Sequence, residues 1–201
     1  MSAASRLLAP LAYLRIEHPA KLKYDFMIPA VLAAVGGALF YFVPHGPPIF
    51  GSTGLVALVN NLLQVLTGFF IASLAAVATF NKEGMDATMP GDPPKLQVMD
   101  RGTRRMINLS RRRFLSLMFG YLTFLSLFIY VLGGVANLFA DPAKALISPD
   151  HVHFIKWCFL FPYLLMLSNL SVTTLLGLFY MADRIHRHDP MLQWGPGNEG
   201  K

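Results

Sequence analysis

Charged residues are missing from three long stretches of this sequence. No Asp, Glu, Lys or Arg occurs in residues 26–80, 114–140 or 157–182. Charged residues make up 14% of the chain and hydrophobic residues 54%, whereas soluble domains carry roughly a quarter charged residues. This lack of charge excludes a soluble domain and predicts an integral membrane protein.

Each uncharged stretch is long enough to cross a bilayer, because a helix needs about 20 apolar residues to span the hydrocarbon core. The first stretch is long enough for two crossings, and the prolines and glycine of residues 44–48 interrupt it near its middle. We therefore predict an all-α fold, a bundle of four transmembrane helices. The predicted spans are residues 26–43, 55–80, 114–140 and 157–182.

The missing charges also exclude several function classes. Proton relays, ion-coupled carriers and voltage sensors need ionisable groups within the membrane, and the predicted spans contain neither charged residues nor histidine. The single cysteine, Cys158, cannot form an internal disulfide. No phosphate-binding glycine loop, zinc-protease motif, nucleophile elbow or internal repeat is visible. We expect neither an enzyme nor a carrier, and no cofactor or bound metal.

The basic residues predict the orientation of the chain. All of the 17 lysines and arginines except Lys144 and Lys156 fall in residues 1–25, 81–113 and 183–201. Because basic residues are retained in the cytoplasm, both termini and the loop between the second and third spans are predicted to be cytoplasmic. The resulting segments are an N-terminal cytoplasmic or interfacial segment (1–25), a first transmembrane hairpin (26–80), a basic loop (81–113), a second hairpin (114–182) and a tail (183–201).

The N-terminal segment contains a short amphipathic pattern. Leu7, Leu8, Leu11 and Leu14 recur at a spacing compatible with a helix. Such a segment lies on the inner membrane surface, or else it folds beneath the membrane domain and occludes a pore.

The second predicted span carries a stripe of neutral polar residues. Asn60, Gln64 and Thr67 fall at positions i, i+4 and i+7 on one helix face. Such residues form hydrogen bonds between packed helices, or they line a pore, where amides and hydroxyls replace part of an ion's hydration shell. In a symmetric oligomer each residue would form a ring. Beside the stripe lies a second face of mostly small residues, made of Asn61, Gly68, Ala72, Ala75 and Thr79.

The basic loop ends in a run of arginines. Residues 95–113 contain no proline, so a helix is predicted to continue from them into the third span, with Arg101, Arg104, Arg105, Asn108 and Arg112 on one face. The arginines retain the loop in the cytoplasm and bind lipid headgroups, or they form a phosphate site for a nucleotide, an oligonucleotide or a phosphoinositide-like ligand. The candidate ligand-binding residues are Arg101, Arg104, Arg105, Arg111, Arg112 and Arg113.

The N-terminal segment 1–25, the four spans and the arginine run 101–113 together resemble membrane effectors of bacterial anti-phage defence, most of all those of the Hailong type. The resemblance implies a tetrameric channel of the bacterial inner membrane with an N-terminal plug. It also implies closure by short single-stranded DNA that a partner nucleotidyltransferase makes, with the arginines on the phosphates and Asn60, Gln64 and Thr67 facing the pore.

We therefore expect a homo-oligomeric channel in the lipid bilayer, gated from the cytoplasm by an anionic nucleotide or oligonucleotide. The alternative is a non-conducting scaffold or accessory subunit that docks a soluble partner on its basic loop.

Overall fold

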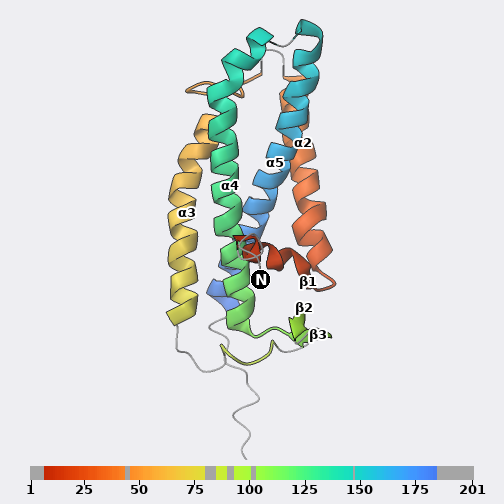
Figure 1. Cartoon of the computed structure of the whole chain (residues 1–201), viewed down its shortest axis with the longest axis vertical. Helices are drawn as coiled ribbons and strands as arrows, with labels where there is room; N and C mark the ends of the chain where they lie inside the picture. The colour runs from red at the N-terminus through yellow and green to blue at the C-terminus, as the bar shows by residue number, and fades with distance from the viewer. Residues whose placement is uncertain are drawn as a thin grey trace, which may run out of the picture.

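The chain folds into four long helices that run between two ends of an elongated molecule, as a computed structural model shows (Figure 1). The structure describes residues 7–43, 46–79, 85–89, 93–100, 103–146 and 148–184. All four helices are long and apolar enough to cross a membrane, which confirms the predicted number of spans. The helices are α2 (Ile28–Phe42), α3 (Leu55–Thr79), α4 (Arg111–Leu146) and α5 (Pro149–Phe179).

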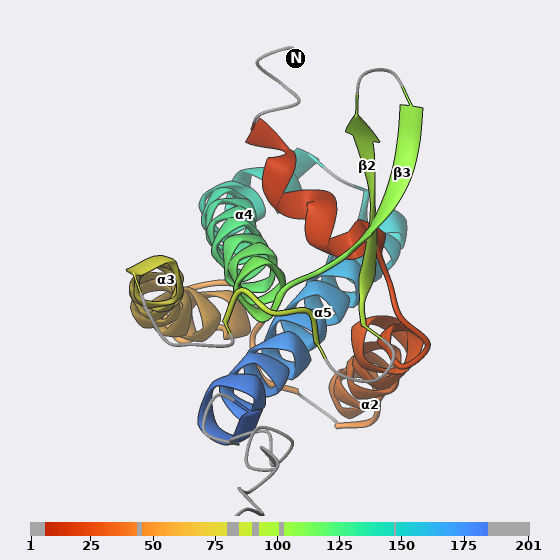
Figure 2. The same cartoon turned by 90° about the horizontal axis from the view of Figure 1, so that it is seen from below.

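The helices pack in the order α3, α4, α5, α2 across the molecule, so α3 and α2 form its two edges (Figures 1 and 2). Strands β2 and β3 and the start of α4 lie at one end, which we name the arginine end. Residues 46–54, the last turns of α4 and the first turns of α5 lie at the other, which contains Lys144 and Lys156 and which we name the lysine end.

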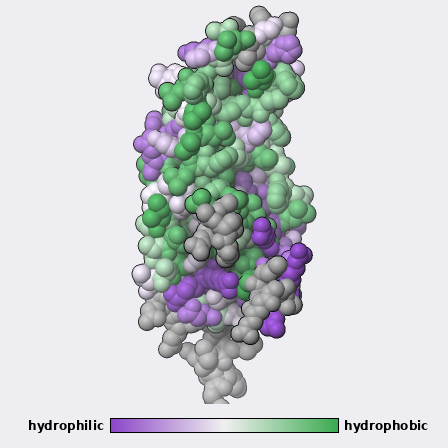
Figure 3. Space-filling model, viewed as in Figure 1, coloured by the Kyte–Doolittle hydropathy of each residue, from purple (hydrophilic) through white to green (hydrophobic). Residues whose placement is uncertain are grey.

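The apolar pattern of the edge helix α3 explains how it packs. Val56, Val59, Leu63, Phe70 and Val77 are buried and recur every three, four or seven residues, so they form one stripe along the helix. That stripe packs against α4. Many large apolar side chains elsewhere on the helices stay exposed, and Figure 3 shows a mostly hydrophobic surface over the middle of the molecule, as expected for a protein surrounded by lipid.

The helix that contains the first predicted span begins before residue 26. A short π-helical segment, η2 (Lys23–Met27), leads directly into α2, and the apolar helix covers Lys23–Phe42. Two charged residues, Lys23 and Asp25, therefore belong to the helix that contains the first predicted span, ahead of the predicted boundary at residue 26. The predicted boundary was set directly after the last charged residue, Asp25. In the structure Asp25 is buried and has hydrogen-bond and ion-pair partners within the protein, as described below.

The N-terminal residues pack against the helices. A 3-10 helix, η1 (Ala9–Arg15), contacts α4, and its Tyr13 is 1% exposed. In Figure 2 this segment crosses the arginine end in front of α4 and α5. Leu7, Leu8 and Leu14 of the amphipathic pattern stay exposed, so this segment packs on the helices through Tyr13 and turns these leucines outward.

A small antiparallel sheet stands where the sequence predicted a helix in residues 95–113. β2 (Lys95–Asp100) pairs with β3 (Thr103–Asn108), and the two-residue β1 (Ile16–Glu17) pairs with the other edge of β2. The helix prediction over residues 95–108 was wrong, because the absence of proline permits a strand as readily as a helix. The decisive pattern has a period of two: Leu96 is buried and Val98 half-buried, while Lys95 and Gln97 are exposed.

Helix α4 therefore begins only at Arg111. Ser110 precedes it and accepts a hydrogen bond at Oγ from the backbone N–H of Arg113, 3.4 Å away, which satisfies one free donor at the helix start.

Candidate functional site

The outward face of α3 carries the first group of candidate residues. In a helix that advances about 100° per residue, this face lies directly opposite the buried stripe. It contains amides and small residues and no large apolar side chain; Asn61 and Gln64 are exposed. A methyl group added at Gly68 would meet no other atom within 4 Å, so no part of the chain that the structure describes covers this position. Figure 3 shows the corresponding hydrophilic patch at the left edge, over the upper half of α3. The face consists of Ala57, Asn61, Gln64, Gly68, Ala72, Ala75 and Thr79.

The three predicted pore-lining residues divide between two environments. Thr67 Oγ1 donates to Leu63 O over 2.7 Å and lies 3.0 Å from Ser126 Oγ of α4. Asn60 Nδ2 donates to Tyr130 O of α4 over 3.4 Å. Gln64, in contrast, is exposed. Asn60 and Thr67 thus make the hydrogen bonds between helices that were the alternative to a pore role, whereas Gln64 and Asn61 are exposed on the outward face of α3.

A pair of polar atoms is enclosed where α3, α4 and α5 meet. Asn60 Oδ1 and the hydroxyl of Tyr163 are buried and have no hydrogen-bond partner among the described residues. A Cβ atom at Gly133 would lie 3.0 Å from the first and 3.1 Å from the second. Glycine is therefore required here for close helix packing. The sequence pattern identified Asn60 but gave no sign of Tyr163.

The predicted arginine face does not exist as a helix face, because Arg104 and Arg105 lie on β3. Successive side chains of a strand point to opposite sides, so these two arginines occupy opposite faces of the hairpin; both are exposed. Arg105 and Arg111 also have partners of their own. Arg113 is exposed in the first turn of α4, and Arg101 lies outside the described residues.

Arg112 already has protein partners in this structure. Its guanidinium binds both carboxylate oxygens of Asp86, at 2.8 and 3.1 Å, and donates to the carbonyls of Val77 and Ala78 at the end of α3. Cations near the last carbonyls of a helix are stabilising, so Arg112 ties the end of α3 to the start of α4. The hydrogen bonds from Arg112 lower the pKa of Asp86. Because these partners already use its guanidinium, Arg112 is poorly suited to an added ligand.

A buried polar cluster joins the N-terminal residues to α4 and α5, and we name it the N-terminal junction: Tyr13, Lys21, Asp25, Tyr121 and Asn169. Asp25 is 3% exposed; its carboxylate accepts a hydrogen bond from the Tyr13 hydroxyl over 3.2 Å and pairs with Lys21. A buried carboxylate needs such compensation.

Two further hydrogen bonds connect the junction to the helices. Asn169 Nδ2 donates to the backbone carbonyl of Asp25 over 2.8 Å. The hydroxyl of Tyr121 donates to Asn169 Oδ1 over 2.8 Å. The rings of Tyr13 and Tyr121 stack with their centroids 5.0 Å apart. Burial, followed by the charge of Asp25, raises the pKa of the Tyr13 hydroxyl far above its ordinary value, so Tyr13 remains a hydrogen-bond donor at any physiological pH.

Sequence patterns did not reveal the junction. From the sequence, Asp25 was treated only as the last charge before the first predicted span, and no site was predicted at Asn169. The one available signal was a carboxylate immediately before an apolar run, with Lys21 four residues earlier at helical spacing. A cavity of about 60 Å³ lies beside the junction, lined in part by His18, Tyr24 and Asp25, and has room for water.

Comparisons with protein families, with curated proteins and with solved structures yielded no match to this chain.

Proposed function

We propose that the chain is the subunit of an oligomeric membrane channel that is gated from the cytoplasm by an anionic ligand. The observation that carries the proposal is the exposure of Asn61 and Gln64 on a membrane-spanning helix. Moving an unpaired amide from water into an apolar medium costs roughly 2–7 kcal/mol. Two such amides in lipid are therefore unfavourable, and contact with another subunit or with a water-filled path would remove that cost.

The arrangement of the helices supports a path between subunits. The four helices of one chain lie in the order α3, α4, α5, α2, and α3 is an edge. Small residues such as Gly68, Ala72 and Ala75 allow close contact between helices. In a ring of identical subunits with α3 toward the axis, the amides of Asn61 and Gln64 would repeat around a central path.

The arginine end supports control from the cytoplasm. Arg104 and Arg113 are exposed there, and guanidinium groups bind phosphate oxygens well. The N-terminal junction holds η1 against α4 at this end. A nucleotide or a short single-stranded DNA, such as a partner nucleotidyltransferase would make in a Hailong-type defence system, has the chemistry that these arginines would bind.

Ion flux from liposomes containing the purified protein tests the proposal. We expect flux from the wild type and a change of flux when a short oligodeoxynucleotide is added on the arginine-end side. The double variant Asn61→Leu, Gln64→Leu should lose flux, whereas Leu62→Ala, an exposed position roughly a third of a turn from the centre of the face, should keep it. Absence of flux from the wild type with and without oligonucleotide would overturn the proposal.

One feature favours the second candidate function, a non-conducting scaffold. β3 is an edge strand of the sheet, and its Met106 is 46% exposed. An open strand edge can bind an extended segment of a partner protein. The scaffold predicts a soluble protein that co-purifies with the chain and is lost when Met106 is changed to Pro, together with liposomes that stay impermeable.

A further inference from the structure

A cavity lies at the lysine end, at the opposite end of the helices from the N-terminal junction. It has a volume of about 400 Å³, which falls within the usual range of ligand pockets, about 300–1,000 Å³. The last turns of α4, the first turns of α5 and residues 48–50 form its walls. Apart from two lysines, every residue that lines it is apolar.

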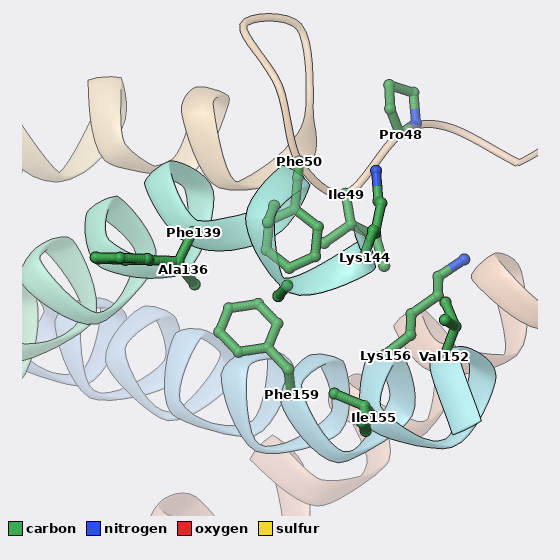
Figure 4. Close-up of a pocket in the computed structure, with 12 residues that line it drawn as sticks. Pro48, Ile49, Phe50, Ala136, Phe139, Lys144, Val152, Ile155, Lys156 and Phe159 are labelled. Atoms are coloured by element: carbon green, nitrogen blue, oxygen red, sulfur yellow. The ribbon is translucent and has the colours of Figure 1, made fainter. Parts of the chain in front are cut away.

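The two lysines are the only Lys or Arg residues that the predicted topology places on this side of the membrane. Lys144 comes from α4 and Lys156 from α5, and both line the same cavity. Figure 4 shows them on one side of the cavity, while the rings of Phe50 and Phe159 lie toward its interior. The ring centroids of Phe50 and Phe159 are 5.3 Å apart. Apolar walls and a cationic rim thus occur together.

The charges of these lysines are largely available to a ligand. Lys144 Nζ lies 3.4 Å from Asp141 Oδ1, but this carboxylate side chain is 94% exposed, and such surface ion pairs contribute little. Among the described residues, Lys156 has no ion-pair partner. Two cations at the mouth of an apolar cavity complement a molecule with an anionic head and an apolar chain.

We infer that this cavity binds an anionic phospholipid, with part of one acyl chain between Phe50 and Phe159 and the phosphate between Lys144 and Lys156. The cavity lies at the ends of two membrane spans, where lipid headgroups and the first acyl carbons meet. Long lysine side chains reach from such positions to the interface. The site does not depend on whether the protein conducts ions.

Native mass spectrometry of the detergent-solubilised protein tests the site. The protein is mixed with equal amounts of phosphatidylglycerol and phosphatidylcholine that carry the same acyl chains, and the ratio of bound lipids is measured. Each lysine near an anionic headgroup is worth about fivefold in affinity. We therefore expect Lys144→Gln and Lys156→Gln each to reduce the preference for phosphatidylglycerol about fivefold, and the double variant roughly 25-fold.

Two further experiments distinguish the contribution of the lipid's acyl chain from that of its headgroup. Ala140→Phe should fill the cavity and reduce the binding of both lipids, while Lys95→Gln, which removes a lysine from the arginine end, should change nothing. Glycerol 3-phosphate, which has the headgroup phosphate but no chain, should not compete. Equal binding of the two lipids by the wild type, or full competition by glycerol 3-phosphate, would overturn the inference, and neither result depends on a variant that folds.

Discussion

Replacing Tyr13 by Phe removes one oxygen atom from the N-terminal junction and keeps the ring that stacks on Tyr121. The lost hydroxyl donates to a carboxylate that is 3% exposed. A hydrogen bond to a charged group contributes roughly 1.5–3 kcal/mol, and solvent does not screen this one, because Tyr13 is 1% exposed. Detachment of η1 from α4 should therefore become roughly 10- to 150-fold more frequent.

Limited trypsin digestion measures this detachment. Arg15, the last residue of η1, should be cleaved faster in Tyr13→Phe by the same factor, because cleavage follows the population of the open state when reclosing is fast. Hydrogen exchange of the backbone amides of residues 9–27 should rise in parallel. Tyr24→Phe makes the same chemical change at a residue that is 41% exposed and should behave as wild type. Equal cleavage rates in both variants and the wild type would refute a junction held by this hydrogen bond.

Two further predictions concern packing and charge. Gly133→Ala places a methyl group 3.0 Å from Asn60 Oδ1 and should destabilise the helix packing by about 1–3 kcal/mol. Gly120→Ala is the control, because Gly120 lies in the same helix with open space around it. This control should leave the melting temperature in detergent unchanged or raise it. Asp86→Asn removes the ion pair with Arg112, whose hydrogen bonds lower the pKa of Asp86 from 3.8. The pair therefore stabilises the protein above that pH, and its effect is lost as the pH falls through the lowered pKa. The melting temperature of the wild type should exceed that of Asp86→Asn at pH 7, and this difference should shrink as the pH falls below 3.8. A higher melting temperature for Gly133→Ala, or a difference between wild type and Asp86→Asn that does not shrink in acid, would contradict these accounts.

The sequence predicted the features that depend on composition and local period. Four spans followed from the stretches without charge, and the small residues of α3 were recognised at helical spacing. The same spacing did not show which side of α3 faces α4. For that reason Asn60 and Thr67 were grouped with Gln64, although the structure turns the first two toward α4 and leaves the third exposed.

The sequence did not predict the features that depend on contacts between distant residues. Asn169 binds the backbone of Asp25, 144 positions earlier, and no local pattern encodes such a pair. The hairpin of β2 and β3 could have been predicted in part, because Leu96 and Val98 alternate with polar residues. Its third strand, β1, comes from the N-terminus, and only the tertiary fold brings these segments together.

The central claim is that the outward face of α3 lines a channel. Its most direct test is whether water reaches this face. Gln64→Cys and Leu62→Cys are made in a Cys158→Ser background, because Cys158 is exposed, and the proteins are treated in liposomes with a charged, membrane-impermeant thiol reagent. The account predicts that Gln64→Cys reacts and that its ion flux is blocked, while Leu62→Cys is protected by lipid and its flux is unchanged. Protection of Gln64→Cys, or equal reaction of both positions, would contradict a water-filled path along this face.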